Sequence, residues 1–392
     1  MNEVYIVGMA RTPIGSFGGS LASLTAVEMG TLVLQEAVKR AGINSEMIDE
    51  VFMGNVLTAN NGQAPTRQAV LAAGFPVNIP CTTINKVCAS GMKAIMLAAQ
   101  TIRLGDNDVV VAGGMESMSN APFYLTKSRW GMKYGNGELI DAIVRDGLQD
   151  PYKGYMMGNC GEICAKEYKF TREEQDAYAI ESYKRAISAN ENGYFADEIM
   201  PVSISAGKGK TIVVSEDDEY KNIIWDKVSA LRPAFDKDGT ITAVNASKIN
   251  DGAAAVVLMS KQKMEELGLK PIAKLLSYAD AGQTPEWFTT TPSLAVPKAV
   301  SKAGLSLSDI DIFEINEAFS VVALANMKLM NIPHAKLNVL GGAVSLGHPI
   351  GASGARITCT LISALKYKGG KIGSAGICNG GGGASALVLE LC

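Results

Sequence analysis

The sequence has little of several features that mark particular classes of protein. Only 2 of its 392 residues are histidine, aromatic residues make up 6%, and the formal net charge is -3. Nucleic-acid and membrane-surface proteins usually carry a basic excess or a basic amphipathic helix, which this nearly neutral chain lacks. No apolar run reaches the roughly 18 uninterrupted residues that a membrane-spanning helix needs. We therefore predict that the protein binds neither nucleic acid nor membranes. Its expected ligands are small molecules, anionic ones included.

The cysteines do not form the pattern of a disulfide framework. Their number is odd and they are scattered along the chain, at positions 81, 88, 160, 164, 359, 378 and 392. Such usage indicates a reducing compartment. The opening residues, MNEVYIVGMARTP, run into a strand-like stretch without a basic region or a long apolar segment. These features predict a cytoplasmic protein.

The chain contains an internal repeat. Gly42 corresponds to Gly304, 262 residues later, and Cys88 corresponds to Gly351, 263 residues later. The matched segments occur in the same order in both halves of the chain: 36–53 with 297–315, 88–102 with 351–365, and 108–115 with 371–378. Because three matches at nearly one offset are hard to obtain by chance, the sequence predicts a duplicated domain.

Each copy alternates helices with short β-branched strands, which predicts a layered α/β sheet. A segment of different texture, rich in Met, Tyr and Gly, interrupts the repeat. We predict an N-terminal core half at residues 1–118, completed by about residues 248–270, and a C-terminal core half at residues 271–392. Between them, residues 119–247 are predicted to form a loop domain that covers one face and binds the ligand.

Cys88 is the first candidate catalytic residue. It stands in NKVCASGMKAI, directly before small residues that open a predicted helix. Free N–H groups and the positive end of a helix favour a thiolate, and Lys86 lies just upstream, so the position suits a nucleophile. The alternative is a buried structural thiol, which is common for free cysteine. The repeat weakens that alternative, because the second copy has Gly351 at the same place.

Two further candidates come from the second half of the chain. His348 lies in GGAVSLGHPIGASGAR, an irregular turn ahead of the helix that matches the one after Cys88. The repeat brings this turn toward Cys88 from the opposite side, so a Cys–His pair is predicted. Cys378 opens CNGGGG, and so many glycines after a buried strand favour backbone that donates N–H groups to a ligand. A flexible turn is the simpler alternative.

Other polar positions give weaker signals. Asn316 and Glu317 follow a predicted strand in FEINEAF and, taken alone, favour a helix cap with an acidic first turn. Cys160 and Cys164 lie four apart on a predicted helix without histidines or a second pair nearby, so we do not predict a metal site there.

Four motifs resemble those of the thiolases, in the same order and along the whole chain: NKVCASG, NEAF, GGAVSLGHPIGASG and CNGGGG. Within that family the chain is similar to the potassium-activated mitochondrial members. The resemblance implies a five-layer αβαβα core made of two halves, a loop domain that binds coenzyme A, and a homo-oligomer, expected to be a homotetramer. It implies acetyl-CoA C-acetyltransferase activity, with coenzyme A as co-substrate, acyl-CoA substrates and no tightly bound cofactor.

The resemblance also assigns roles to the candidate residues. Cys88 becomes acylated, Cys378 removes an α-proton from a second acetyl-CoA, and His348 activates Cys88. His348 and a water held by Asn316 supply one oxyanion hole, and the backbone N–H groups of Cys88 and Gly380 supply the other. Such fixed donors are needed because the α-carbon of a thioester is a weak acid.

The same resemblance places coenzyme A against a further set of residues. The implied lining is Leu148, Met157, Phe235, Ala243, Ser247, Ala318 and Phe319. Lys221 is added as a phosphate contact from its charge and region. The resemblance also implies a potassium site. The ion would be held by the side chain of Tyr220 and by the backbone oxygens of Ala243, Val244, Ala246 and Val344. Carbonyl and phenolic oxygens suit such a hard cation.

Two positions near the substrate depart from the family pattern. Met156 stands where biosynthetic members carry histidine, and Thr289 replaces a proline of the mitochondrial type. They leave open a broader-chain 3-ketoacyl-CoA thiolase of β-oxidation. A ketoacyl synthase is disfavoured because Cys378 stands where that class uses histidine or asparagine, and a silent acyl-CoA-binding protein because all three reactive residues are present.

Overall fold

The core consists of two similar halves, seen in a computed structural model that describes residues 2–205, 207 and 209–392. The N-terminal half contains β1 (Val4–Arg11), β2 (Gly15–Ser16), α1 (Ala26–Ala41), β3 (Glu50–Gly54), α2 (Pro65–Ala72), β4 (Cys81–Ile84), α3 (Ser90–Leu104), β5 (Val109–Ser117), β10 (Asn250–Ser260) and α6 (Lys261–Glu266). The C-terminal half contains β11 (Ala273–Gly282), α7 (Pro292–Lys302), β12 (Ile312–Ile315), α8 (Ser320–Met330), α9 (Ala343–Leu346), α10 (Ser353–Lys368), β13 (Ile372–Asn379) and β14 (Gly383–Leu391).

The strand order confirms the predicted duplication. The main sheet runs β12-β13-β14-β11-β1-β10-β5-β3-β4, and its halves meet where β1 and β11 pair antiparallel, with Tyr5 opposite Lys274. Outward from this junction, β1, β10, β5 and β3 correspond to β11, β14, β13 and β12. The outermost pairs also agree, because β3 is parallel to β5 as β12 is parallel to β13.

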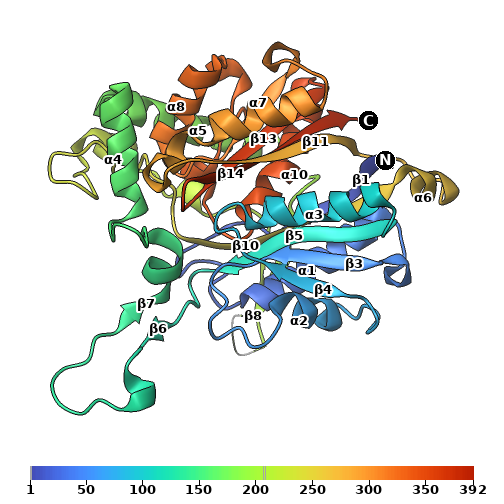
Figure 1. Cartoon of the computed structure of the whole chain (residues 1–392), viewed down its shortest axis with the longest axis horizontal. Coiled ribbons are helices and arrows are strands. Elements are labelled where there is room, and N and C mark those ends of the chain that lie inside the picture. The colour runs from blue at the N-terminus through green and yellow to red at the C-terminus, as the bar shows by residue number, and fades with distance from the viewer. Residues whose placement is uncertain (1, 206, 208) are drawn as a thin grey trace.

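Helices and sheet halves form the five layers that were expected (Figure 1). α1 and α2 cover the outer face of the N-terminal half, α7 covers the outer face of the C-terminal half, and α3 and α10 pack between the two. Along β5, Val110 belongs to the central core with α3 and α10, whereas Val109 and Val111 belong to the core under α1. The strand is apolar throughout because both of its faces are buried.

The two central helices approach each other closely at a pair of glycines. A Cβ placed on Gly354 would lie 2.4 Å from the backbone nitrogen of Met92, and one on Gly91 would lie 2.9 Å from that of Ala355. Gly91 and Gly354 are 263 residues apart, which is the repeat offset. Each lies in the first turn of its helix, so the residues just before the two helices are brought together.

Gly354→Ala is therefore expected to destabilise the protein. Alanine normally favours a helix over glycine by about 1 kcal/mol, but here its methyl group would meet backbone that cannot move away. We expect the free energy of unfolding to fall by about 1–3 kcal/mol, as for other overpacked cores. The decrease is measured by urea denaturation, as a lower midpoint concentration. Gly282→Ala is the matched control, because no atom of the described residues lies within 4 Å of its Cβ position; equal effects in both variants would contradict the argument.

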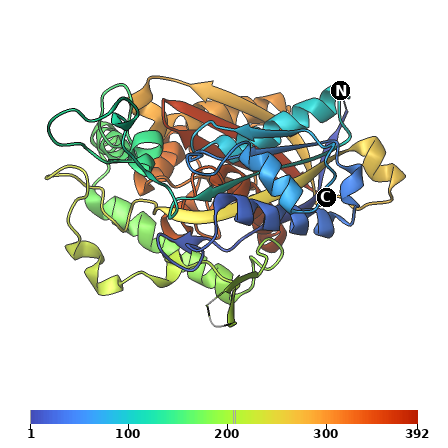
Figure 2. The same cartoon turned by 90° about the horizontal axis from the view of Figure 1, so that it is seen from below.

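The insertion between β5 and β10 supplies one wall of the candidate site. It contains β6 (Phe123–Tyr124), β7 (Ile140–Asp141), α4 (Met157–Tyr168), α5 (Arg172–Glu191), β8 (Val202–Ser205) and β9 (Thr211–Val214). α4 and α5 pack against α8 and α9, and Figure 2 shows α5 lying along one side of the core. The domain boundaries themselves stay a prediction. In the described part of the chain, no helix has both the length and the apolar character to cross a membrane.

Candidate active site

A strained turn places Cys88 ahead of α3. Val87 has a φ of 47°, in the left-handed region that β-branched residues rarely adopt. The turn is held by Ser90, whose hydroxyl donates to the Val87 carbonyl (2.6 Å) and accepts from the N–H of Lys86 (2.8 Å). Such strain persists only where the surrounding structure fixes it, and it clusters at functional sites.

The electrostatics of Cys88 differ from the prediction of a thiol made acidic by its surroundings. Burial raises the pKa of Cys88 to about 11, although the backbone N–H groups of Gly380 and of Cys88 itself act on the sulfur and oppose this rise. The predicted contribution of Lys86 is wrong, because its ammonium group is paired with Asp280 and donates to the hydroxyl of Ser385 (2.8 Å). Cys88 is therefore a neutral thiol at pH 7.

Hydrogen bonds determine which ring nitrogen of His348 is basic. The Ser353 hydroxyl donates its only proton to the carbonyl of Pro349 (2.9 Å). The hydroxyl oxygen of Ser353 can therefore only accept from Nδ1 of His348, 2.6 Å away. Nδ1 then carries the proton, and Nε2 keeps its lone pair. Nε2 is buried and has no hydrogen-bond partner among the described residues. A basic nitrogen in this condition is ready to accept a proton.

The backbone of His348 is held firmly, and its ring stays neutral. Its N–H donates to Oδ1 of Asn250 (2.8 Å), and the Asn250 amide donates to Glu219 (2.9 Å) and to the carbonyl of Gly15 (3.0 Å). Burial lowers the pKa of His348 to about 3, and the positive charge of Arg356 adds to the effect. The side chain is thus an uncharged base at pH 7.

Cys378 lies near the end of β13, ahead of the turn into β14. Its side chain is fully buried, and burial together with the neighbouring Cys88 raises the pKa of Cys378 well above its usual range. In the turn, Gly381 and Gly382 adopt φ values of 85° and 84°, which other residues rarely take. The glycine run therefore has a conformational reason, and it brings the N–H of Gly380 to the sulfur of Cys88.

Asn316 lies between β12 and α8 with its amide group unpaired. Both polar atoms of the side chain are buried and lack partners among the described residues. Buried polar atoms are nearly always hydrogen-bonded, so this amide is placed to hold a water or a ligand. The interpretation as a helix cap is wrong, because Phe319 is the N-cap of α8 and Glu317 accepts from the Tyr178 hydroxyl (2.8 Å).

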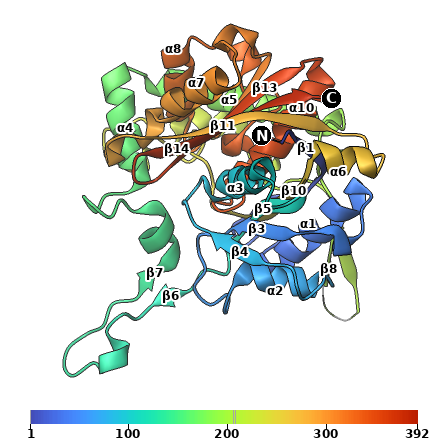
Figure 3. The ribbon, with the colours of Figure 1, turned by 45° about the vertical axis from the view of Figure 1, so that its right-hand side comes forward.

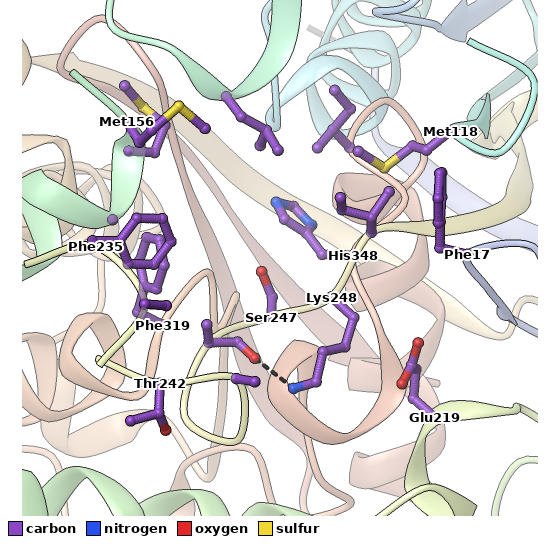
Figure 4. Close-up of a pocket in the computed structure, with 18 of the residues that line it drawn as sticks. Phe17, Met118, Met156, Glu219, Phe235, Thr242, Ser247, Lys248, Phe319 and His348 are labelled. Carbon is purple, nitrogen blue, oxygen red and sulfur yellow. Dashed lines mark hydrogen bonds between the residues drawn. The ribbon is translucent and has the colours of Figure 1, made fainter. Parts of the chain in front are cut away.

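An apolar cavity of about 570 Å³ opens at His348 (Figure 4). Cys88 packs against the same apolar cluster as Leu148, which lines the cavity, and Cys378 shares another cluster with Met157 and Phe319. Six of the eight residues predicted to bind coenzyme A line this space: Leu148, Met157, Phe235, Ala243, Ser247 and Phe319. The cavity has the size and apolar character usual for small-molecule sites.

The remaining predicted contacts lie outside the cavity wall. The carbonyl of Ala318 accepts from the N–H of Ser247 (3.0 Å), so it supports a lining residue. Lys221 forms an exposed ion pair with Glu216 (2.6 Å). Of the two positions that depart from the family pattern, Met156 lines the cavity, whereas Thr289 is buried elsewhere.

Sequence reasoning missed several cavity residues: Ser16, Phe17, Met118, Glu219, Asn222, Ala234, Thr242, Lys248, Ile249 and Ile350. Two of them had a usable signal, since Lys248 follows Ser247 and Ile350 lies two residues after His348. Phe17 had none, because it belongs to a loop far from every motif.

Glu116 was also missed, although it joins the turn that contains His348 to the segment that follows β3. Its Oε2 accepts from the N–H groups of Gly351 (2.8 Å) and Val56 (3.0 Å), and its Oε1 accepts from the N–H of Leu57 (3.0 Å). Burial raises the pKa of Glu116 to about 7, while these donors oppose the rise. The available signal was an acidic residue at the end of a buried strand, which is rare unless the carboxylate is well paired.

The predicted potassium ligands do not fit an ion in the observed arrangement. Nζ of Lys248 donates to the carbonyls of Ala246 (2.7 Å) and Val344 (3.3 Å), and the hydroxyl of Tyr220 donates to Glu216 (3.0 Å). A cation about 4 Å from the ammonium would be repelled by roughly 4 kcal/mol at an effective dielectric constant of about 20. An ammonium group therefore takes two of the five contacts that were expected for the metal, the carbonyls of Ala246 and Val344.

Comparison with known proteins agrees with this geometry. The family described as "Thiolase, N-terminal domain" matches residues 4–262, and "Thiolase, C-terminal domain" matches residues 269–391. Acetyl-CoA acetyltransferase 1 of Arabidopsis thaliana is 58% identical over 390 residues, which cover 99% of this chain and 94% of the relative. A cytosolic acetyl-CoA acetyltransferase of Gibberella zeae is 57% identical over 99% of this chain and 98% of the relative. A mitochondrial acetyl-CoA acetyltransferase of Rattus norvegicus is 54% identical over 100% of this chain and 91% of the relative.

Solved structures give the same result for the fold. A thiolase of Ascaris suum, crystallised in complex with coenzyme A, superposes with a TM-score of 0.95 at 51% identity and covers 100% of both chains. The acetyl-CoA acetyltransferase of Bacillus anthracis superposes with a TM-score of 0.97 at 44% identity, covering 100% of this chain and 99% of its own. With both domains matched over nearly its full length, the chain belongs to the thiolase family.

Proposed function

We propose that the protein is an acetyl-CoA C-acetyltransferase, which interconverts two acetyl-CoA with acetoacetyl-CoA and coenzyme A. The observation that carries the proposal is a pair of neighbouring thiols, Cys88 and Cys378, packed in the same apolar clusters as residues of the cavity that His348 lines. The Nε2 atom of His348 is buried and has no hydrogen-bond partner among the described residues. A thiol nucleophile, a second thiol and a neutral base are the groups that thioester exchange and α-proton removal require. The names of the similar proteins support the same activity.

In the first half-reaction, Nε2 of His348 takes the proton of Cys88 and the resulting thiolate attacks the thioester carbonyl. The N–H groups of Cys88 and Gly380, which already act on the sulfur, are suited to stabilise the oxyanion that forms on the attached carbon. The carbon–sulfur bond to coenzyme A then breaks. Cys378 protonates the departing thiolate, which leaves acetyl-Cys88, an imidazolium at His348 and a thiolate at Cys378.

In the second half-reaction, the Cys378 thiolate removes an α-proton from a second acetyl-CoA. The enolate oxygen is stabilised by the Nε2–H of His348 and by a water on the unpaired amide of Asn316. The enolate carbon attacks the acetyl group, the bond to Cys88 breaks, and the Cys88 thiolate recovers its proton from His348. Cys88, His348 and Cys378 are then back in their starting protonation states: the α-proton of the second acetyl-CoA stays on Cys378, and the original Cys378 proton has left on the free coenzyme A.

Thiolysis assays with three substrates test the proposal. With free coenzyme A, kcat/KM for acetoacetyl-CoA is expected to exceed that for a longer straight-chain 3-oxoacyl-CoA by about tenfold or more, because one misfitting methylene is worth roughly 10–200-fold. 2-Methylacetoacetyl-CoA reports whether a branch fits beside Met156, which lines the cavity. Equal or higher activity on long chains would instead identify a broad-chain β-oxidation thiolase. Inactivity on all three would indicate a silent acyl-CoA-binding protein.

We also propose that the protein forms a homotetramer. The arm around β6 and β7 projects from the core (Figure 3) and exposes several large apolar side chains: Phe123, Leu125, Trp130, Met132, Tyr134 and Leu139. A concentration of exposed apolar groups on one segment favours association with another protein surface, and a second copy of the chain is the simplest partner. A cytoplasmic location is supported by the cysteine usage and by the cytosolic relative, although mitochondrial relatives are similar too.

A further inference from the structure

Lys248 holds an unusual position at the wall of the cavity. Its Nζ donates to the carbonyl of Ala246 (2.7 Å), the hydrogen bond drawn from Lys248 in Figure 4. It also donates to the carbonyl of Val344 (3.3 Å) and lies 5.8 Å from the centre of the Tyr183 ring. An ammonium group has three N–H donors and no acceptor, so carbonyl oxygens are its natural partners inside a protein. The lysine therefore uses its charge to join two pieces of backbone rather than to face solvent.

The two pieces of backbone belong to different parts of the site. Ala246 precedes Ser247, which lines the cavity and whose N–H bonds to the segment before α8. Val344 lies in α9, four residues before His348, and its own N–H donates to Glu317 (3.1 Å). The ammonium thus connects the wall against which coenzyme A is proposed to lie with the segment that carries the proposed base.

The surroundings keep this ammonium charged. Burial lowers the pKa of Lys248 to about 8, while the negative charges of Glu219 and Glu317 oppose the decrease. The group is therefore still mainly protonated at pH 7. Clustered carbonyl oxygens are also what a bare alkali cation needs to replace its hydration shell, so the same oxygens could serve either kind of cation but not both at once.

We propose that Lys248 is a built-in cation, which positions the cavity wall against the segment of His348 and makes the protein independent of potassium. It acts as a positioning residue, because its ammonium contacts backbone rather than the reacting atoms. The inference rests on the proposed function for its activity measurement only. Thermal stability in different salts tests the cation site without any catalysis.

The experiment compares four proteins in potassium, sodium and choline chloride at pH 7 and an ionic strength of about 0.1 M. Lys248→Ala removes the ammonium and opens the carbonyls, Lys248→Met removes the charge but fills the space, and Lys263→Ala is a control on exposed α6. In choline chloride, Lys248→Ala should raise KM for acetoacetyl-CoA by roughly tenfold, a usual size for coupling between neighbouring sites. Potassium should return the KM of Lys248→Ala toward the wild-type value but leave the KM of Lys248→Met unchanged. It should raise the Tm of Lys248→Ala and of no other protein in the set.

The wild-type protein and Lys263→Ala should give the same KM and Tm in all three salts. Strong activation of the wild-type protein by potassium at pH 7 would overturn the proposal, even if Lys248→Ala failed to fold. An unchanged KM in Lys248→Ala without any potassium effect would overturn it too. If none of the four proteins, the wild type included, catalyses thiolysis, the proposed function fails. A potassium-dependent Tm confined to Lys248→Ala would still support the cation site.

Discussion

Cys378→Ser is expected to separate the two half-reactions. Cys88 should still be acylated by acetyl-CoA, because His348 takes its proton and a thiolate leaves readily without an acid. Condensation should fall by about 10²–10⁴-fold, the usual contribution of a positioned acid or base, because serine is far too weak an acid to supply the proposed base. Mass spectrometry of the Cys88 peptide measures acylation, and formation of acetoacetyl-CoA measures condensation.

Two other cysteine variants make this result interpretable. Cys88→Ser should lose both acylation and condensation, because the nucleophile itself is gone. Cys359→Ser is the matched control, since Cys359 is also a fully buried thiol but its charged neighbours, Glu198 and Arg11 among them, do not line the cavity. If Cys88→Ser and Cys378→Ser lost the acyl label equally, the proposed division of labour between the two thiols would be wrong.

The large-scale fold could be predicted because its evidence is repeated within the chain. The match of Cys88 with Gly351 implied equivalent helix starts, and the structure places α3 and α10 together at Gly91 and Gly354. The approach of the turns before these helices follows from that pairing. The repeat therefore predicted the duplicated, layered core, and it leads to the further prediction that both halves contribute side chains to one site at these helix starts.

The electrostatics of the site could not be predicted in the same way. A thiol before a helix was expected to be acidic, but burial outweighs the nearby N–H groups and raises the pKa of Cys88 to about 11. The neighbouring lysine was expected to help, yet Lys86 reaches Asp280, which lies far away in the sequence. Such effects depend on which distant side chains meet, and neither motif nor spacing records that. The same reason applies to Lys248, whose partner Val344 is 96 residues away.

The resting state of Cys88 gives a second prediction with a large effect. With a pKa of about 11, roughly 1 thiol in 10⁴ is ionised at pH 7, so acylation depends on proton transfer to His348 within the complex. His348→Ala should therefore lower the rate of acylation by acetyl-CoA by about 10²–10⁴-fold at pH 7. Alkylation of Cys88 by iodoacetamide should keep rising with pH beyond 9, because this reagent needs only the thiolate and burial has moved the thiol pKa upward.

The pH profile of alkylation distinguishes this state from a preformed ion pair. A neutral thiol beside a neutral imidazole gives no plateau between pH 5 and 8, since the pKa of His348 is near 3 and that of Cys88 is near 11. A thiolate–imidazolium pair would instead react at an almost constant rate across that range, and such a plateau would contradict the structure. Ser353→Ala is the matched variant, because it keeps the imidazole ring and removes the acceptor of Nδ1–H (2.6 Å) together with one hydrogen bond to the Pro349 carbonyl (2.9 Å). It should slow acylation by roughly tenfold, less than His348→Ala, because the imidazole remains but its tautomer is no longer fixed.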